Sequence, residues 1–377
     1  MSAFLKNKIM TDKTSLTIPL IEFFKAGGTL KNCKPITKKR YIAYPEETNN
    51  EVNKFKWRVV EELYLPNPRG MHNFRVTIEE KCRTRRLKVE GSIRKWIYGK
   101  TSLEDTSRNQ IPIFVKELAD SLCLSEEFVW NKLKISNTEL GYNFTTNLCW
   151  KDIVRHCVQY GRTKDRIDYD NKNDCLYWNG DDKSLKMYNK SEEMPANIRN
   201  RTRKIEAEKI VSSLAKRGQT LCRIEVTLDD KNSFKKYGLS EIRTLRDIYE
   251  NWDKLHALLV KEIAKIRIES KVHISERMTP RQQEIAKQIN SSPSFDIAAE
   301  KISKMYYHSD KNRAKREMFV VMSNFSSPKH CSIRTFRKAI AKRLTFIDRN
   351  REKLPLSDLF HILWRTSKGR KLKLRTV

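Results

Sequence analysis

The first 238 residues alternate between apolar and polar positions in many short stretches. A period of two is typical of a strand with one buried face. The sequence predicts such strands at residues 12–20, 53–66, 73–80, 86–93, 135–144, 175–178, 185–188 and 222–228. It predicts helices, from apolar spacings of three and four, at residues 112–122, after Ser125, around 150–157 and at 203–216.

From Ser240 onward the apolar spacing is almost only helical. It predicts one long amphipathic helix from residue 240 to about 269. Thr279, with Pro280 after it and Gln282 three residues on, predicts a helix start with a capping box. Two more helices are expected at residues 294–306 and 332–343.

The change of period predicts an α+β fold with three parts. Residues 1–238 would form an α+β domain built on an antiparallel sheet with packed helices. Residues 239–278 would form a long connecting helix. A mainly helical, basic region, with a basic tail from residue 365, would complete the chain over 279–377.

The composition predicts a polyanionic partner. The 377 residues carry a formal net charge of +31 and a pI near 9.8, which is typical of proteins that bind nucleic acid. Charge alone separates neither DNA from RNA nor an enzyme from a binding protein. None of the eight cysteines forms a C-x-x-C pair, and no apolar run is long enough to span a bilayer. We therefore expect a cytoplasmic protein that does not contact the membrane.

One tyrosine has a setting that suits nucleophilic chemistry. Tyr188 lies at the far end of a predicted strand, and Lys190 follows two residues later, on the same face of an extended chain. A tyrosine can attack a phosphodiester and keep the phosphate in a covalent bond. A phenol has a pKa near 10, so a neighbouring cation helps it to ionise. The alternative is an amphipathic strand end in which Tyr188 packs and Lys190 is solvated.

Two glutamates on predicted strands are candidate metal ligands. Glu139 has apolar neighbours, and Glu225 alternates with Arg223. Converging carboxylates suit Mg²⁺ or Mn²⁺, which would polarise a scissile phosphate. In the alternative, Glu225 pairs with Arg223 and Glu139 with a nearby lysine. The sequence contains no His-x-His pair and no phosphate-binding G-x-x-x-x-G-K-[ST] loop.

Basic residues are candidates for DNA contact in two places. Arg94 and Lys95 precede Trp96 and Tyr98, and rings can stack on bases while cations meet phosphates. The helix predicted from Ser332 has an apolar face and a basic face, which suits contact with a groove or a backbone. The first segment could equally be a basic strand with aromatic side chains in the core, and the second a solvated basic helix. The predicted DNA-binding residues are Arg94, Lys95, Arg223, Arg334, Arg337, Lys338 and Lys342.

In chain order, five segments together resemble the gene II/X replication proteins of filamentous phages. They are the strand near Asp12, Gly91–Lys95, Glu139–Asn143, Tyr188–Glu193 and Arg223–Glu225 with the Lys-x-x-Gly-Leu segment after it. The likeness covers most of residues 10–260 and is weaker near 332–344. Trans-acting rolling-circle plasmid initiators carry a related pattern.

The resemblance implies a rolling-circle replication initiator, an endonuclease that nicks and rejoins one DNA strand at an origin. It implies Tyr188 as the nucleophile, Lys190 as its helper, and Glu139, Glu193 and Glu225 as ligands of Mg²⁺ or Mn²⁺. The histidine pair of the wider nicking superfamily is missing here.

The implied partner is single-stranded or locally melted circular DNA at a phage or plasmid origin, with host helicase and polymerase as further partners. Two other functions fit the same charge and fold. A non-catalytic origin-binding protein would melt DNA for other enzymes, and an RNA-binding structural protein would bind through its basic surface.

The basic tail generates the first prediction. If residues 365–377 bind phosphates, deleting them weakens binding to all DNA sequences alike, and the slope of log K against log salt becomes shallower by roughly 0.7–0.9 for each phosphate that is no longer bound. The nick site should stay where it was, because we expect site choice to depend on the N-terminal domain. Affinities of full-length and truncated protein over a salt series measure this. An unchanged slope would mean that the tail is only a solvated end, and a moved nick site would mean that the tail takes part in specificity.

Overall fold

The computed structural model describes residues 10–36, 57–103, 105–161, 167–168, 175–180, 183–198, 200–228, 231–263, 265–268 and 272–325. The chain forms two compact units. The N-terminal unit comprises Lys8–Gly141 and Thr227–His256. The second unit comprises Tyr142–Val226 and the described residues from Ala257 onward.

The N-terminal unit is built on an antiparallel sheet with the strand order β2-β3-β4-β5-β1-β6. In β1, Leu16 and Ile18 point into the core, and Leu16 lies opposite Val89 of β5. This alternation is what the sequence predicted. The strands are β1 (Met10–Pro19), β2 (Lys34–Pro35), β3 (Arg58–Leu65), β4 (Phe74–Lys81), β5 (Thr84–Ser92) and β6 (Lys134–Thr146), which continues into the second unit.

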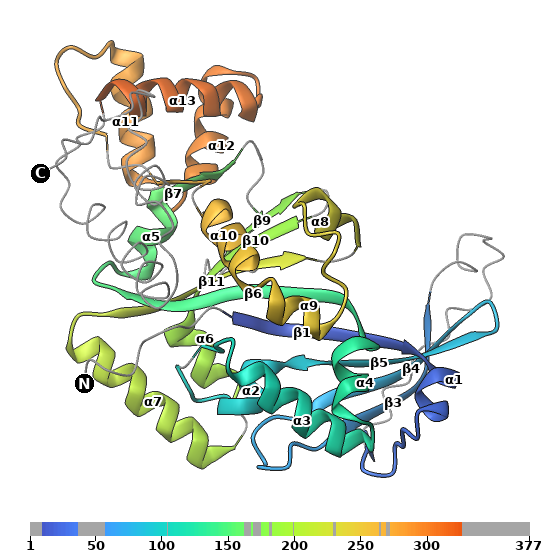
Figure 1. Ribbon diagram of the computed structural model, residues 1–377. Coiled ribbons are helices and arrows are strands. Elements are labelled where there is room, and N and C mark those ends of the chain that lie inside the picture. Colours follow the sequence, from blue (N-terminus) through green and yellow to red (C-terminus); the bar gives the residue numbers. More distant parts are fainter. Residues whose placement is uncertain are drawn as a thin grey trace, which may run out of the picture. The chain divides into compact units, whose positions relative to one another are not determined.

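Helices α2 (Ile93–Tyr98) and α3 (Gln110–Leu122) lie on one face of this sheet (Figure 1). Phe74, Trp96 and Phe114 form the aromatic centre of the core, with ring centroids 5.0–6.3 Å apart. Gly91 lies so close to Phe74 that a Cβ there would be 2.3 Å from its ring. Other helices of this unit are α1 (Leu20–Lys25), α4 (Glu126–Asn131), α8 (Lys231–Lys236) and α9 (Leu245–Glu250).

In the second unit the strand order runs from the end of β6 as β6-β11-β10-β9-β8. Strands β9 and β10 pair antiparallel, with Tyr188 opposite Cys175. Most of β11 is buried on both faces, as expected for a strand with a neighbour on each side. The strands are β8 (Ile167–Asp168), β9 (Cys175–Gly180), β10 (Lys183–Asn189) and β11 (Thr220–Leu228), and the helices are α5 (Trp150–His156), α6 (Lys190–Ala196) and α7 (Arg201–Lys216).

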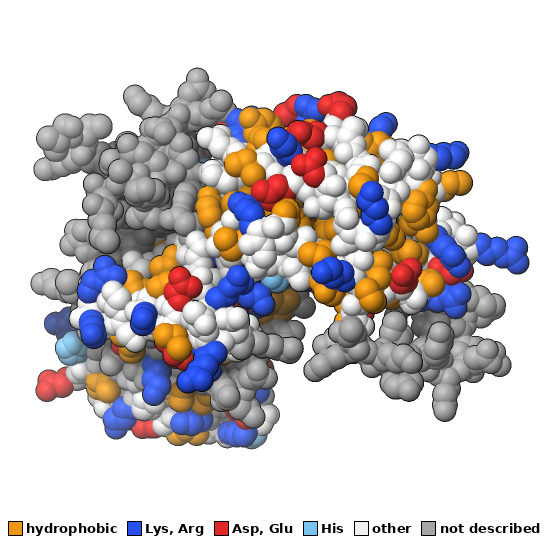
Figure 2. Space-filling model, turned by 90° about the horizontal axis from the view of Figure 1, so that it is seen from below, with side chains coloured by type: hydrophobic (Ala, Val, Ile, Leu, Met, Phe, Trp, Pro, Cys, Tyr) orange, Lys and Arg blue, Asp and Glu red, His pale blue; other side chains and the backbone are white. Residues whose placement is uncertain are grey.

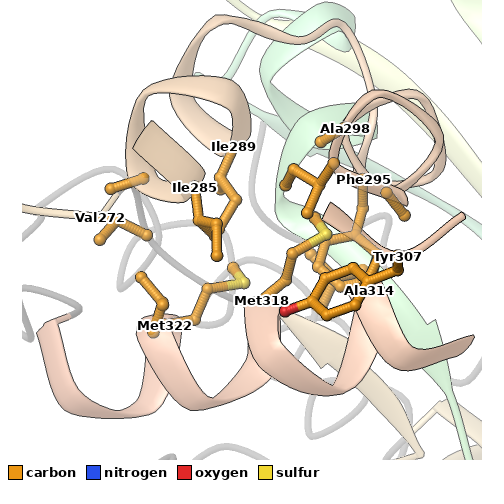
Figure 3. Close-up of a cluster of buried hydrophobic side chains, with 14 of the residues drawn as sticks. Val272, Ile285, Ile289, Phe295, Ala298, Tyr307, Ala314, Met318 and Met322 are labelled. Carbon is orange, nitrogen blue, oxygen red and sulfur yellow. The ribbon is translucent and has the colours of Figure 1, made fainter. Parts of the chain in front are cut away.

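Three C-terminal helices of the second unit share their own hydrophobic core. Side chains from all three helices point toward one another around Met318 (Figure 3). Val158, in the strand pair of β7 (Cys157–Tyr160) and β12 (Ile266–Ile268), also belongs to this core. The helices are α11 (Pro280–Ser291), α12 (Phe295–Tyr306) and α13 (Lys311–Phe325).

The structure confirms the predicted α+β class and most predicted elements within the described residues. It contradicts the single helix predicted from residue 240 to 269. Thr244 caps the start of helix α9 with a capping box, and α9 ends at Glu250, with Asn251 as its C-cap. A second helix, α10 (Trp252–Ile263), follows, and then strand β12. The sequence does not reveal this break, because apolar residues recur at helical spacing both in α9 and in α10.

Lys and Arg side chains are spread across the face shown in Figure 2, among apolar and acidic ones. Within the part of the chain that the structure describes, no helix is long and apolar enough to cross a membrane. The basic helix predicted at 332–343 and the tail at 365–377 lie outside the described residues.

Candidate active site

Tyr188 lies near the end of β10, on the face of the strand opposite Leu185 and Met187. Its side chain is 9% exposed. The phenolic hydroxyl donates a hydrogen bond of 3.1 Å to Oε1 of Glu225. Lys186, two residues earlier on the same face, has its ammonium 4.9 Å from the centroid of the tyrosine ring. Tyr188 is therefore held at both its ring and its hydroxyl.

Glu225 and Arg223 form a buried ion pair on β11. The Arg223 side chain is fully buried and donates through Nε to Glu225 Oε1. One of its terminal nitrogens, Nη1, donates to Oδ1 of Asn143 on β6 at 3.0 Å. Charges in a protein interior are costly unless they are paired and hydrogen-bonded. This requirement brings the tyrosine hydroxyl, the carboxylate, the guanidinium and the amide into one network.

Lys190 is close to Tyr188, but it does not continue the strand as predicted. Asn189 caps helix α6, since its side chain accepts a hydrogen bond from the backbone N–H of Ser191. Lys190 is thus the first residue of that helix. Its side chain is 3% exposed and binds the carboxylate of Glu193, and its ammonium lies 5.5 Å from the centroid of the Tyr188 ring. Two lysines therefore flank the tyrosine, one from the strand and one from the helix.

The three predicted metal ligands have different surroundings. Glu225 is paired with Arg223, and Glu193 with Lys190. Glu139 belongs to the N-terminal unit, near Lys13. Burial lowers the pKa of Lys13, but the Glu90 hydrogen bond and the charges of Glu90 and Glu139 outweigh it and raise that pKa. Among the described residues, no group of three or more His, Cys, Asp or Glu side chains is arranged to hold a metal ion.

Two arginines predicted to contact DNA lie inside the protein instead. Arg223 has the partners described above. Arg94 is also fully buried, because Ser92 starts helix α2 and turns Arg94 inward, where it donates to the backbone oxygen of Ser102 at 2.7 Å. Lys95, next to it, is half-buried. The predicted contacts Arg334, Arg337, Lys338 and Lys342 lie outside the described residues.

Two residues of this site, Lys186 and Asn143, were not among the residues predicted from the sequence. Lys186 could have been found, because it lies two residues before Tyr188 in a strand and so shares its face. Asn143 gave no such signal. It contacts Arg223 across 80 residues of sequence, and only strand order brings β6 beside β11.

This arrangement can position and deprotonate a phenol. Glu225 accepts a hydrogen bond from the phenolic oxygen at 3.1 Å, within the range at which a carboxylate can accept a proton. The cations of Lys186 and Lys190 lie on the ring of the same tyrosine, where positive charge favours a developing phenolate and an approaching phosphate.

Comparison with known proteins identifies a family. The family model for the N-terminal part of the phage replication-associated gene II protein matches residues 46–253, more than half of the 377-residue chain. The matched range contains Tyr188, Lys190, Glu193 and Glu225. No curated protein and no solved structure matches the chain.

The buried ion pair generates a stability prediction. Arg223→Met leaves Glu225 buried without its cation, and breaking a buried pair from one side costs about 3–5 kcal/mol. Urea unfolding monitored by tryptophan fluorescence measures the loss. The control is Lys254→Met, which removes an exposed partner of Glu241 and is expected to cost less than about 1 kcal/mol.

A double variant separates the effect of the ion pair on stability from the effect of side-chain packing. Arg223→Met with Glu225→Leu removes both charges and should recover part of the lost stability. If Arg223→Met costs no more than Lys254→Met, the ion pair does not stabilise the second unit.

Proposed function

The chain belongs to the replication-associated protein family of the filamentous-phage gene II proteins, and on this basis we propose that it nicks and rejoins one DNA strand at an origin through Tyr188. Family membership supports a role in replication, with DNA at an origin as the partner. The contact of the Tyr188 hydroxyl with Glu225, beside two lysines, is the observation that carries the nicking activity.

In the proposed reaction, the Tyr188 oxygen attacks the phosphorus of a phosphodiester in single-stranded DNA. The bond from phosphorus to the 3′ oxygen breaks, and the 5′ phosphate becomes a phosphotyrosine ester. The phenol proton passes to Glu225, and the departing 3′ oxygen takes up a proton to become a hydroxyl. Because the ester keeps the bond energy, attack by a 3′ hydroxyl can later reverse the step and rejoin the strand.

The neighbouring residues have separate roles in this proposal. Glu225 orients the hydroxyl and accepts its proton, while Arg223 holds the carboxylate in place. Lys186 and Lys190 offset negative charge on the phenolate and on the phosphate. Lys190 is in turn held by Glu193, so Glu193 is proposed as a positioning residue.

Dependence on Mg²⁺ or Mn²⁺ stays a prediction that rests on the family resemblance. The described carboxylates do not fit a cluster of three ligands, because Glu193 and Glu225 are each paired with a cation. The proposed roles of Tyr188, Glu225 and the two lysines therefore do not involve a metal. When bound, a divalent ion would polarise the scissile phosphate.

One observation favours a second candidate, a non-catalytic origin-binding protein. The Tyr188 side chain is only 9% exposed, and its hydroxyl already has a partner, as in a packed structural tyrosine. In that case the charge serves to bind and melt DNA for other enzymes. The two functions differ in whether the phenolic oxygen is needed for breaking a strand.

The test is a nicking assay on a supercoiled plasmid. The plasmid carries the noncoding DNA of the phage or plasmid that encodes this protein, where its origin is expected to lie. Tyr188→Phe should lower the nicking rate by roughly 10³-fold or more, since it removes the nucleophile. DNA affinity should change less than about twofold, because only one hydroxyl is lost. The matched control is Tyr142→Phe, which alters a fully buried tyrosine and should leave nicking unchanged.

Parallel reactions with Mg²⁺, with Mn²⁺ and with a chelator test the metal. Chelation should stop nicking, and either ion should restore it. If Tyr188→Phe nicks at the wild-type rate, Tyr188 is not the nucleophile. If no variant and no wild-type protein nicks the plasmid with either ion, the origin-binding function is favoured.

A further inference from the structure

The three C-terminal helices carry a feature that the proposed nicking reaction does not use. Helices α12 and α13 are joined by only four residues, 307–310, and α13 lies across the direction of α11 and α12 (Figure 1). Two helices joined by a short turn at a steep crossing are the arrangement by which a helix-turn-helix protein presents its second helix to duplex DNA.

The turn is sharp and well fixed. His308 and Ser309 both adopt left-handed backbone conformations, with φ of 48° and 71°. The backbone N–H groups of Tyr307 and Ser309 both donate to the carbonyl of Ser303 and so close the end of α12. Asp310 then caps α13, because its Oδ1 accepts from the N–H of Arg313 at 3.0 Å. The chain therefore reverses with few residues and little freedom.

Contacts outside the core fix α13 against both other helices. Arg281 of α11 pairs with Glu317 of α13 at 3.0 Å and also donates to the Tyr307 hydroxyl. Lys315 of α13 pairs with Asp296 of α12 at 2.8 Å. Within the core, Ala314 and Met318 of α13 face the side chains of α11 and α12 (Figure 3). A rigid scaffold is what a reading helix needs, since a loose one loses its geometry.

The outer face of α13 carries side chains suited to base edges. Asn312, Arg316 and Val320 follow one another at intervals of four and share a face, and Arg313 lies beside them. All four are exposed, Val320 to 52%. Among the described residues, Asn312 and Arg316 make no hydrogen bond or ion pair through their side chains. Asn suits adenine, Arg suits guanine, and an apolar group suits the thymine methyl.

The charge on α13 also favours contact with DNA. Its first six residues, 311–316, include four basic residues and no acidic one. Two of the four, Lys311 and Lys315, are paired with Glu300 and Asp296 of α12, which leaves Arg313 and Arg316 for an outside anion. Arg313 lies 5.1 Å from the centroid of the Tyr307 ring, which supports its guanidinium at the start of the helix.

We propose that α11, α12 and α13 form a duplex-DNA-binding module in which α13 enters the major groove and reads bases with Asn312, Arg313 and Arg316. This function does not depend on Tyr188. It assigns recognition of double-stranded DNA to residues 279–325, whereas the sequence alone placed site choice in the N-terminal domain, and it leaves strand breakage to the tyrosine site. The major groove is the partner that admits a whole helix and shows a distinct pattern for each base pair.

The test starts with the full chain and a pool of random-sequence DNA duplexes, from which bound duplexes are enriched and sequenced. Binding is then measured by fluorescence anisotropy on the enriched duplex, on a shuffled duplex of equal composition and on the separated strands. Arg316→Ala should weaken binding to the enriched duplex by roughly 5- to 150-fold, the range for one bidentate base contact. It should weaken binding to the shuffled duplex much less.

Two matched variants separate base reading from charge. Arg316→Lys keeps the charge but loses the planar fork, so the salt slope should stay while preference for the enriched duplex falls. Lys287→Ala removes an exposed charge on α11 and should leave the preference intact. Arg316 is exposed, so these variants should unfold at the wild-type urea concentration.

Independent readouts keep the two proposals apart. Tyr188→Phe should bind the enriched duplex like wild type, and Arg316→Ala should nick a single-stranded oligonucleotide like wild type. The module proposal is overturned if no duplex sequence is enriched, or if Arg316→Ala keeps the wild-type preference. It is also overturned if the Arg316 variants lose affinity only for the separated strands.

Discussion

A charged pair buried in the sheet of the second unit requires polar partners from the strands on either side of it. Arg223 and Glu225 lie on β11, between β6 and β10, where unpaired charge would be strongly destabilising. Asn143 from one neighbour satisfies the guanidinium, and Tyr188 from the other donates to the carboxylate. The tyrosine is thus fixed by a requirement of folding. The same contact gives its hydroxyl a proton acceptor, so stability and the proposed chemistry depend on one interaction.

In the two proposals, the second unit keeps strand breakage and sequence recognition on separate elements. The tyrosine site is small, buried and closely hydrogen-bonded, as a reacting group needs to be. The helix α13 instead presents an exposed face, and behind it lies a hydrophobic core that includes Ile285, Ile302 and Met318. Recognition of sequence and breakage of a strand can then vary independently. The +31 net charge supplies general attraction to DNA for both.

Local sequence patterns predicted most of the strands and helices. Alternation found β1, β4, β10 and β11, and the capping box of Thr279 with Gln282 found the start of α11. The predictions were wrong where a helix or a strand ends without a change in the apolar pattern. Asn251 ends a helix within a continuous apolar stripe, and Asn189 turns Lys190 out of its strand. Candidate residue types were visible, but their partners were not. Alternation leaves open whether the Arg223 face meets solvent or another strand, and no pattern in sequence pairs it with Asn143.

The central claim is that the Tyr188 oxygen forms the covalent bond to DNA. Incubating the full chain with an origin-containing single strand that has a radiolabelled phosphate at the nick, then digesting the adduct and sequencing the labelled peptide by mass spectrometry, tests this directly. We expect one labelled peptide, with the 5′ phosphate attached to Tyr188. Label on another residue, or strand breakage by an active protein with no covalent peptide at any time, would contradict it.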